Sequence, residues 1–126
     1  PVVFDHIARI KPAEGLKQPA FQLLLDLLKE DRFWVKVSGA DKICNTRVHS
    51  YPGVPYMEVV PFARAVIAAA PERVIWGTDW PHSNNFAPGY TPNDGDLLDL
   101  LLEFAPSEAL RRKILVDNPA ALYGFD

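Results

Sequence analysis

The chain has 126 residues, of which 48% are hydrophobic and 23% are charged, with a net charge of −3 and a pI near 5.6. This composition is that of an ordinary globular domain with a single core. The acidic balance gives no support for nucleic-acid binding, which calls for clustered Lys and Arg, and no apolar run approaches the roughly 20 residues of a membrane helix. Cys44 is the one cysteine, which excludes an internal disulfide and favours a cytoplasmic location.

Three short apolar runs predict buried strands at residues 2–4, 33–37 and 73–76. Between these runs, apolar residues recur at the spacing of amphipathic helices, first in residues 21–28 and then in residues 59–70. The second of these helices is expected to start late or to bend in its first turn at Pro61, and to stop at Pro71.

The last third of the chain is predicted to be a Pro-, Gly- and Asn-rich loop followed by helices. The loop covers residues 81–95, and leucines at helical spacing follow in residues 97–102. Ser107 is expected to cap another helix, with an acidic residue in its first turn. In the final segment, Asn118 is interpreted as a helix cap before a proline and Gly124 as the helix stop.

The order of these elements, β-α-β-α-β-α-α, predicts an α/β fold with a parallel sheet. Three parallel βα units with extra C-terminal helices make a thin sheet with two open edges, but they would make a good arc of a larger barrel. We therefore expect residues 1–126 to form one segment of such a barrel. Because the first predicted strand begins at residue 2, we also expect an N-terminal part to be missing.

Each predicted strand ends in groups that can titrate or form hydrogen bonds, at the edge where parallel α/β folds bind ligands. The polar groups are Asp5, His6 and Arg9 after the first strand, Ser38, Asp41 and Lys42 after the second, and Asp79 and His82 after the third. Structural roles compete with functional ones at every position. Asp79 could form an Asx turn, His6 could be a hydrogen-bonded core histidine, and Arg9 could pair with Asp5. Lys42 and Arg47 could be surface charges in a loop over residues 41–56, and His82 could be an ordinary loop residue.

Four segments, taken in order, resemble the C-terminal part of the amidohydrolase-2 family, especially its lactonase branch. They are Asp5-His6-Ile7-Ala8-Arg9, Val35-Lys36-Val37-Ser38-Gly39-Ala40-Asp41, Trp76-Gly77-Thr78-Asp79-Trp80-Pro81-His82 and Asn118-Pro119-Ala120-Ala121-Leu122-Tyr123-Gly124. The resemblance covers nearly the whole chain, and the Trp-Gly-Thr-Asp-Trp-Pro block is its most specific part. It implies the last three βα units of a (β/α)₈ TIM barrel.

The resemblance also implies roles for individual residues. Asp79 corresponds to the general base for the hydrolytic water, and His6 to a histidine that binds metal or polarises the scissile carbonyl. Arg9 corresponds to an arginine that holds a substrate carboxylate. The basic residue expected after the next strand is Lys42 or, as a second choice, Arg47; Ser38 and His82 are further candidates for substrate contacts.

Two departures from the family pattern bear on the cofactor. Ala8 stands where a glycine is often found, and the paired His-x-His of the family's first strand has no counterpart in these residues. A divalent metal such as zinc could use His6 and Asp79, yet a zinc-type site wants roughly three protein ligands, and the lactonase branch includes members that use no metal. Both possibilities stay open at this point.

The function predicted on this basis is hydrolysis of a carboxylate-bearing lactone, resembling 2-pyrone-4,6-dicarboxylate, or of a related carbonyl compound by Asp79-activated water. One alternative is a decarboxylase of the same superfamily. Another is an inactive structural or assembly fragment that covers its open sheet edges with another copy or with a missing N-terminal half. The substrate, the metal requirement and the oligomeric state do not follow from the sequence, and the isolated chain is expected to be inactive.

Overall fold

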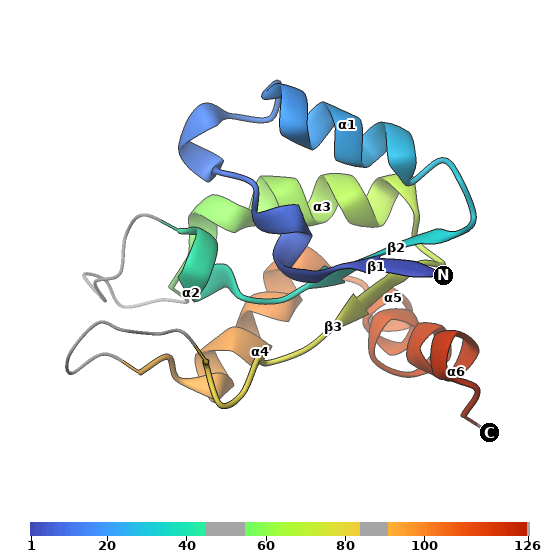
Figure 1. The fold of residues 1–126 in the computed structure, drawn as a ribbon. Helices are drawn as coiled ribbons and strands as arrows, with labels where there is room; N and C mark the ends of the chain where they lie inside the picture. Colours follow the sequence, from blue (N-terminus) through green and yellow to red (C-terminus); the bar gives the residue numbers. More distant parts are fainter. Residues whose placement is uncertain (45–54, 84–90, 126) are drawn as a thin grey trace.

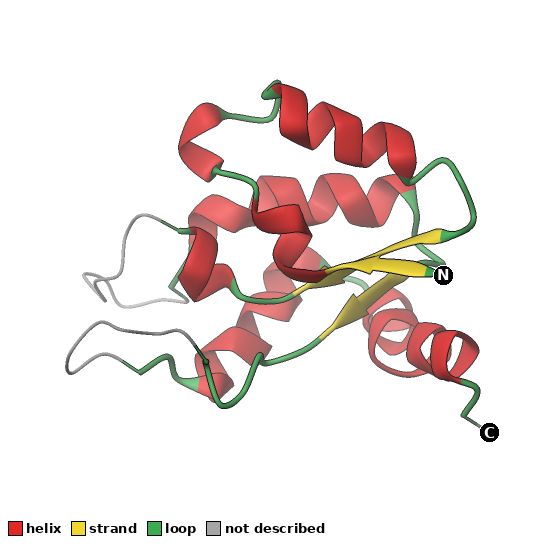
Figure 2. Cartoon of the chain, viewed as in Figure 1, coloured by secondary structure: helices red, strands yellow, loops and turns green. Residues whose placement is uncertain are grey.

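The computed structural model describes residues 1–44, 55–83 and 91–125. A three-stranded sheet lies at its centre with helices packed around it (Figures 1 and 2). The strands are β1 (Val2–Phe4), β2 (Phe33–Val37) and β3 (Val74–Trp76), and the α-helices are α1 (Pro19–Leu27), α2 (Ala40–Ile43), α3 (Val60–Ala69), α4 (Asp94–Phe104), α5 (Glu108–Arg112) and α6 (Asn118–Tyr123). Short turns η1 (Asp5–Arg9), η2 (Pro12–Glu14) and η3 (Met57–Val59) and a π-helical turn, η4 (Lys113–Asp117), complete the list.

The three strands are parallel and follow the order β1-β2-β3, which confirms the predicted α/β arrangement. Phe4 pairs with Val35, and Val37 pairs with Trp76. The carboxyl ends of all three strands therefore meet at one rim, on the left of Figure 1, while both chain termini lie on the right. In an open parallel α/β sheet, this is the rim at which ligands bind.

One face of the sheet packs against the helices, and the alternation along β2 shows which side chains point there. Val35 and Val37 have no exposed surface, whereas Trp34, before them, and Lys36, between them, are half-buried. Because successive side chains of a strand point to opposite faces, Lys36 lies on the face away from the helices. The helix-facing side is sealed by the apolar stripes of α1, α3 and α4, including Phe21, Val66 and Leu100.

Most predicted elements are confirmed. Pro61 lies in the first turn of α3, as expected, where its missing N–H costs no helical hydrogen bond. Two details differ. A short helix, α2, occupies the start of the segment predicted as a loop. Asn118 was predicted to be an N-cap, which is wrong: it is already helical and its side-chain amide donates to the carbonyls of Pro71 at 2.9 Å and Val74 at 2.7 Å. This residue thus joins the C-terminal helices to the start of β3.

The sheet leaves β1 and β3 with one strand neighbour each among the described residues. An unpaired strand edge is a template for further pairing, and natural proteins usually cover it. None of the helices in the described ranges combines the length and apolar character needed to cross a membrane.

Candidate functional site

The first part of the rim is a left-handed turn that presents His6 and Arg9. Residues 6 to 9 have φ values of 53°, 49°, 54° and 52°, although none of them is glycine. Each such conformation costs roughly 1–2 kcal/mol in an L-residue, so the surrounding structure must hold the turn in place. Ile7, in the middle of the turn, has no exposed surface, and its burial in the core is one of these anchors.

The imidazole of His6 is fixed by contacts with the end of β2. Its Nδ1 lies 2.8 Å from the hydroxyl oxygen of Ser38, which is itself buried. The next residue, Gly39, has φ of +61°, and a Cβ there would lie 2.5 Å from His6 Nδ1. Glycine at this position therefore permits both the left-handed backbone and the close approach of the ring.

Asp79 meets the same imidazole from the end of β3. Its Oδ1 lies 3.5 Å from His6 Nε2, and its Oδ2 lies 2.6 Å from Lys42 Nζ. The contact with Lys42 is an ion pair rather than a well-aligned hydrogen bond, while Lys42 also donates to the carbonyl of Ser83 at 2.6 Å. The side-chain hydrogen bond that forms the turn comes from Thr78 and not from Asp79: the Thr78 hydroxyl accepts from the N–H of Trp80.

The electrostatics of the rim favour a neutral His6 beside a carboxylate. Burial lowers the pKa of His6, and the nearby Asp79 opposes this only in part. A neutral ring facing a carboxylate is expected to carry its proton on Nε2, so that the Ser38 hydroxyl donates to Nδ1. His6 is then a hydrogen-bond donor aimed into the space in front of Asp79.

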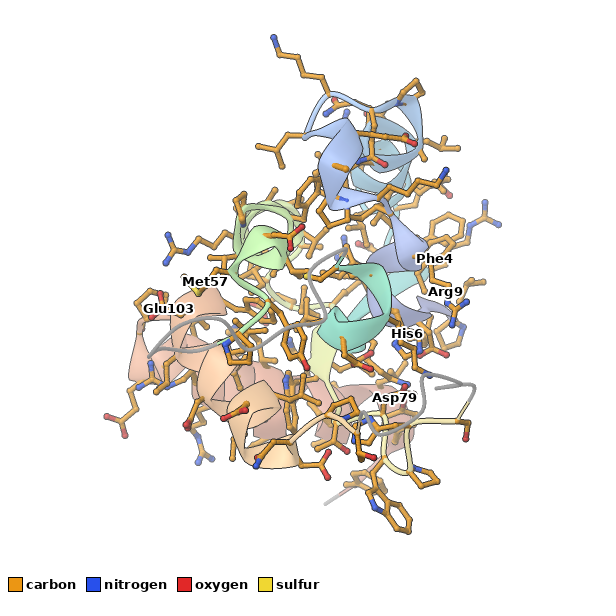
Figure 3. All side chains as sticks on the ribbon, turned by 90° about the vertical axis from the view of Figure 1, so that its left-hand side faces the viewer. Phe4, His6, Arg9, Met57, Asp79 and Glu103 are labelled. Atoms are coloured by element: carbon orange, nitrogen blue, oxygen red, sulfur yellow. The ribbon has the colours of Figure 1, made fainter. Side chains whose placement is uncertain are left out.

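The other predicted site residues do not contact the carboxylate of Asp79 with their side chains in the described ranges. Arg9 is exposed beside His6, with no ion pair in the described ranges. His82 is buried: its backbone N–H donates to the carbonyl of Asp79 at 2.7 Å, and its Nε2 lies 2.9 Å from Asp94 Oδ1 at the start of α4. Arg47 lies outside the described residues. Figure 3, which faces the rim, shows His6, Arg9 and Asp79 on one side of the view, opposite Met57 and Glu103.

Two polar residues at this end of the molecule, Lys36 and Asp94, were not predicted as site residues, and Asp41 was placed at the rim without a role. Lys36 Nζ lies 2.7 Å from Asp5 Oδ1, and Asp94 holds His82. Asp41 is buried, and burial raises its pKa. The alternation along β2 could have identified Lys36, because a lysine between two fully buried valines must face the other side of the strand. Nothing local in the sequence indicates the contact between His82 and Asp94.

The possible metal ligands do not by themselves fit a metal site. His6 and Asp79 converge, but the described ranges contain no group of three or more His, Cys, Asp and Glu side chains placed to hold an ion. A zinc-type catalytic site needs about three protein ligands. The ammonium group of Lys42 also lies against Asp79 Oδ2, where it would repel a metal cation on that oxygen.

Comparisons with known proteins extend over nearly the whole chain. A family model described as Amidohydrolase matches residues 1–125. The chain is 52% identical over 124 residues to 4-sulfomuconolactone hydrolase of Rhizobium radiobacter. The aligned region covers 98% of this chain and 40% of that protein. It is 41% identical over 125 residues to 2-pyrone-4,6-dicarboxylate hydrolase of Comamonas testosteroni, covering 97% of the chain and 40% of that protein.

A solved structure gives the same picture for the fold. An apo crystal structure of an Agrobacterium tumefaciens protein superposes with a TM-score of 0.75 at 34% identity, covering 98% of this chain and 42% of that one. The chain thus spans about 40% of the length of the curated relatives that it matches. Its three parallel βα units form part of a barrel-type α/β protein, as the order of elements predicted.

Proposed function

We propose that this chain, which belongs to the amidohydrolase family, is the part of a lactone-hydrolysing enzyme that supplies the water-activating carboxylate. The two relatives described above are hydrolases named for lactone or pyrone substrates. In the whole enzyme, further βα units would cover the open edges of β1 and β3 and complete the barrel. The site would then be assembled from this rim and from residues outside the chain.

The observation that carries the proposal is the convergence of His6 and Asp79, which are 73 positions apart in the sequence, to 3.5 Å between Nε2 and Oδ1. Lys42 holds the other carboxylate oxygen of Asp79, so Oδ1 is the oxygen turned towards the imidazole. A water molecule bound at Oδ1 can pass its proton to the carboxylate as it attacks a carbonyl carbon. Asp79 is therefore assigned the role of general base.

His6 is assigned to the carbonyl oxygen of the substrate. Negative charge develops on that oxygen when water adds, and a preorganised N–H donor lowers the barrier most when it is aimed at this position. The Ser38 hydroxyl fixes the tautomer by bonding to Nδ1 at 2.8 Å, so the proton is on Nε2, whose 3.5 Å separation from Asp79 Oδ1 is too long for a strong hydrogen bond. Nε2–H can therefore turn to the substrate oxygen. As the tetrahedral intermediate collapses, the bond between the carbonyl carbon and the ring oxygen breaks, the proton taken up by Asp79 passes to the departing oxygen, and the lactone opens to a hydroxy acid or its keto form.

Anionic lactones are the substrate class that the charges at the rim support. Arg9 is exposed and beside the reacting groups, and a guanidinium can grip a carboxylate or sulfonate with two parallel hydrogen bonds. Both relatives carry an acidic group in the substrate name, a sulfo group in one and two carboxylates in the other. Use of a metal, the cytoplasmic location and the substrate-binding roles of Ser38, Lys42, Arg47 and His82 stay predictions.

The test is turnover by the full-length protein that carries this chain. We expect it to hydrolyse 4-sulfomuconolactone or 2-pyrone-4,6-dicarboxylate faster than an uncharged lactone of similar size, and Asp79→Asn to remove nearly all of this activity while far-UV circular dichroism stays unchanged. Asp99→Asn, a change of the same type at an exposed position of α4, is the matched control. Full activity of Asp79→Asn would contradict the mechanism, and release of CO₂ in place of ring opening would support the decarboxylase alternative.

A further inference from the structure

The left-handed turn that carries His6 and Arg9 needs an anchor at each end. Its four consecutive positive φ values are a conformation that persists only where neighbouring structure enforces it. After His6, the anchor is apolar: Ile7 and Ile10 are both buried, and the N–H of Ile10 donates to the carbonyl of Ile7. Before His6, the turn begins at Asp5, which is largely exposed and has no apolar side chain to bury.

Lys36 provides the contact at that first residue. The register pairs Phe4 with Val35, so Asp5 and Lys36 are neighbours on the sheet face that points away from the helices. Lys36 Nζ lies 2.7 Å from Asp5 Oδ1. The contact with Lys36 is the main reason why the pKa of Asp5 is lowered.

The stem of Lys36 also reaches the strand that leads to Asp79. A Cβ placed on Gly77, two residues before Asp79, would lie 3.6 Å from Lys36 Cδ, so the stem runs beside the first residue after β3. One side chain from the middle strand thus pairs with the first residue of the loop after β1 and lies next to the first residue of the loop after β3.

We propose that Lys36 is a positioning residue for hydrolysis, which holds the start of the left-handed turn, and hence the His6 ring, in register with Asp79. This inference rests on the proposed function for its kinetic consequence. Ion pairs with exposed partners add little to folding stability, and Asp5 is 61% exposed in its side chain. The effect of Lys36 is therefore expected in the geometry of the site, since small displacements of reacting groups are costly to rate, and much less in the stability of the fold.

The variants for the test are Lys36→Met, which removes the charge and keeps a similar length, and Lys36→Arg, which keeps the charge. Lys29→Met is the matched control, because Lys29 also forms an ion pair at 2.7 Å, with Asp26, but at the exposed end of α1. In the full-length protein we expect Lys36→Met to lower kcat by about 10- to 100-fold with KM almost unchanged. Lys36→Arg should restore most of kcat, and Lys29→Met should leave it unaltered.

A second readout does not depend on catalysis. The ¹⁵N resonances of the His6 ring, assigned by their loss in His6→Gln, should shift in Lys36→Met and keep their wild-type positions in Lys36→Arg and Lys29→Met. Unchanged His6 resonances in Lys36→Met would overturn the positioning role, as would a rise in KM with kcat preserved, which would make Lys36 a substrate-binding residue. If the wild-type protein opens no lactone, the proposed function fails, and the resonances still decide whether Lys36 orients His6.

Discussion

Gly39 lies where an added methyl group would displace the His6 ring, so Gly39→Ala tests how the site is held. The new Cβ would be 2.5 Å from His6 Nδ1 and 2.7 Å from its Cγ, distances so short that the ring or the backbone at residue 39 must shift. The left-handed backbone alone costs an alanine roughly 1–2 kcal/mol, and overpacking adds roughly 1–3 kcal/mol. We expect Gly39→Ala to lower the free energy of unfolding by about 2–5 kcal/mol in total.

Gly124→Ala separates the two costs. Gly124 has φ of +74° and ψ of 34°, close to the +61° and 32° of Gly39, but no atom lies within 4 Å of its added Cβ. Urea unfolding should therefore show only the backbone cost in Gly124→Ala. In Gly39→Ala, a displacement of the His6 ring by about 1 Å should in addition lower turnover by about 100-fold. Turnover of Gly124→Ala should stay at the wild-type level. Equal losses of stability and equal turnover in the two variants would refute the view that Gly39 exists to admit the imidazole.

Three further predictions follow from individual contacts. Lys42→Met should lower kcat by about 10-fold or more, measured by steady-state kinetics, because Asp79 Oδ2 loses its ion pair; activity equal to wild type would contradict this. Asn118→Ala should lower the free energy of unfolding by about 2–3 kcal/mol, because two hydrogen bonds to Pro71 and Val74 are lost, while kcat stays the same. Burial lowers the pKa of His6 below its usual 6.5, so the unfolded chain binds the proton first, and the free energy of unfolding should fall as pH drops below 6.5. In urea unfolding measured at several pH values, His6→Gln should make this fall less steep. An equally steep fall in His6→Gln would contradict the assignment to His6.

The parallel sheet could be predicted because its signals are local. The strand segments are short apolar runs, and the helices between them have clear stripes such as Phe21 and Leu24 in α1. Once parallel strands are inferred, their carboxyl ends must share a rim, and this places His6 and Asp79 near one another without knowledge of any distance. The structure confirms this convergence at 3.5 Å.

What could not be predicted depends on contacts between distant parts of the chain. Asn118 has the local pattern of a cap, but its amide is used by the carbonyls of Pro71 and Val74, which no local pattern reveals. His82 follows Asp79 closely in the sequence, yet its ring is buried against Asp94. The left-handed turn after β1 is also invisible in the sequence, because it contains no glycine and its conformation is imposed by the surrounding packing.

The assignment of Asp79 as a general base is tested most directly by a single turnover in H₂¹⁸O with enzyme in excess over the lactone. If Asp79 activates water, the solvent oxygen adds to the carbonyl carbon, and mass spectrometry of the first product should find one ¹⁸O atom in the newly formed carboxylate. If Asp79 instead attacked the carbonyl to form an anhydride, and water then attacked the Asp79 carbonyl carbon to release the product, the product of this first turnover would carry an unlabelled oxygen from the enzyme. An unlabelled carboxylate would therefore contradict the account.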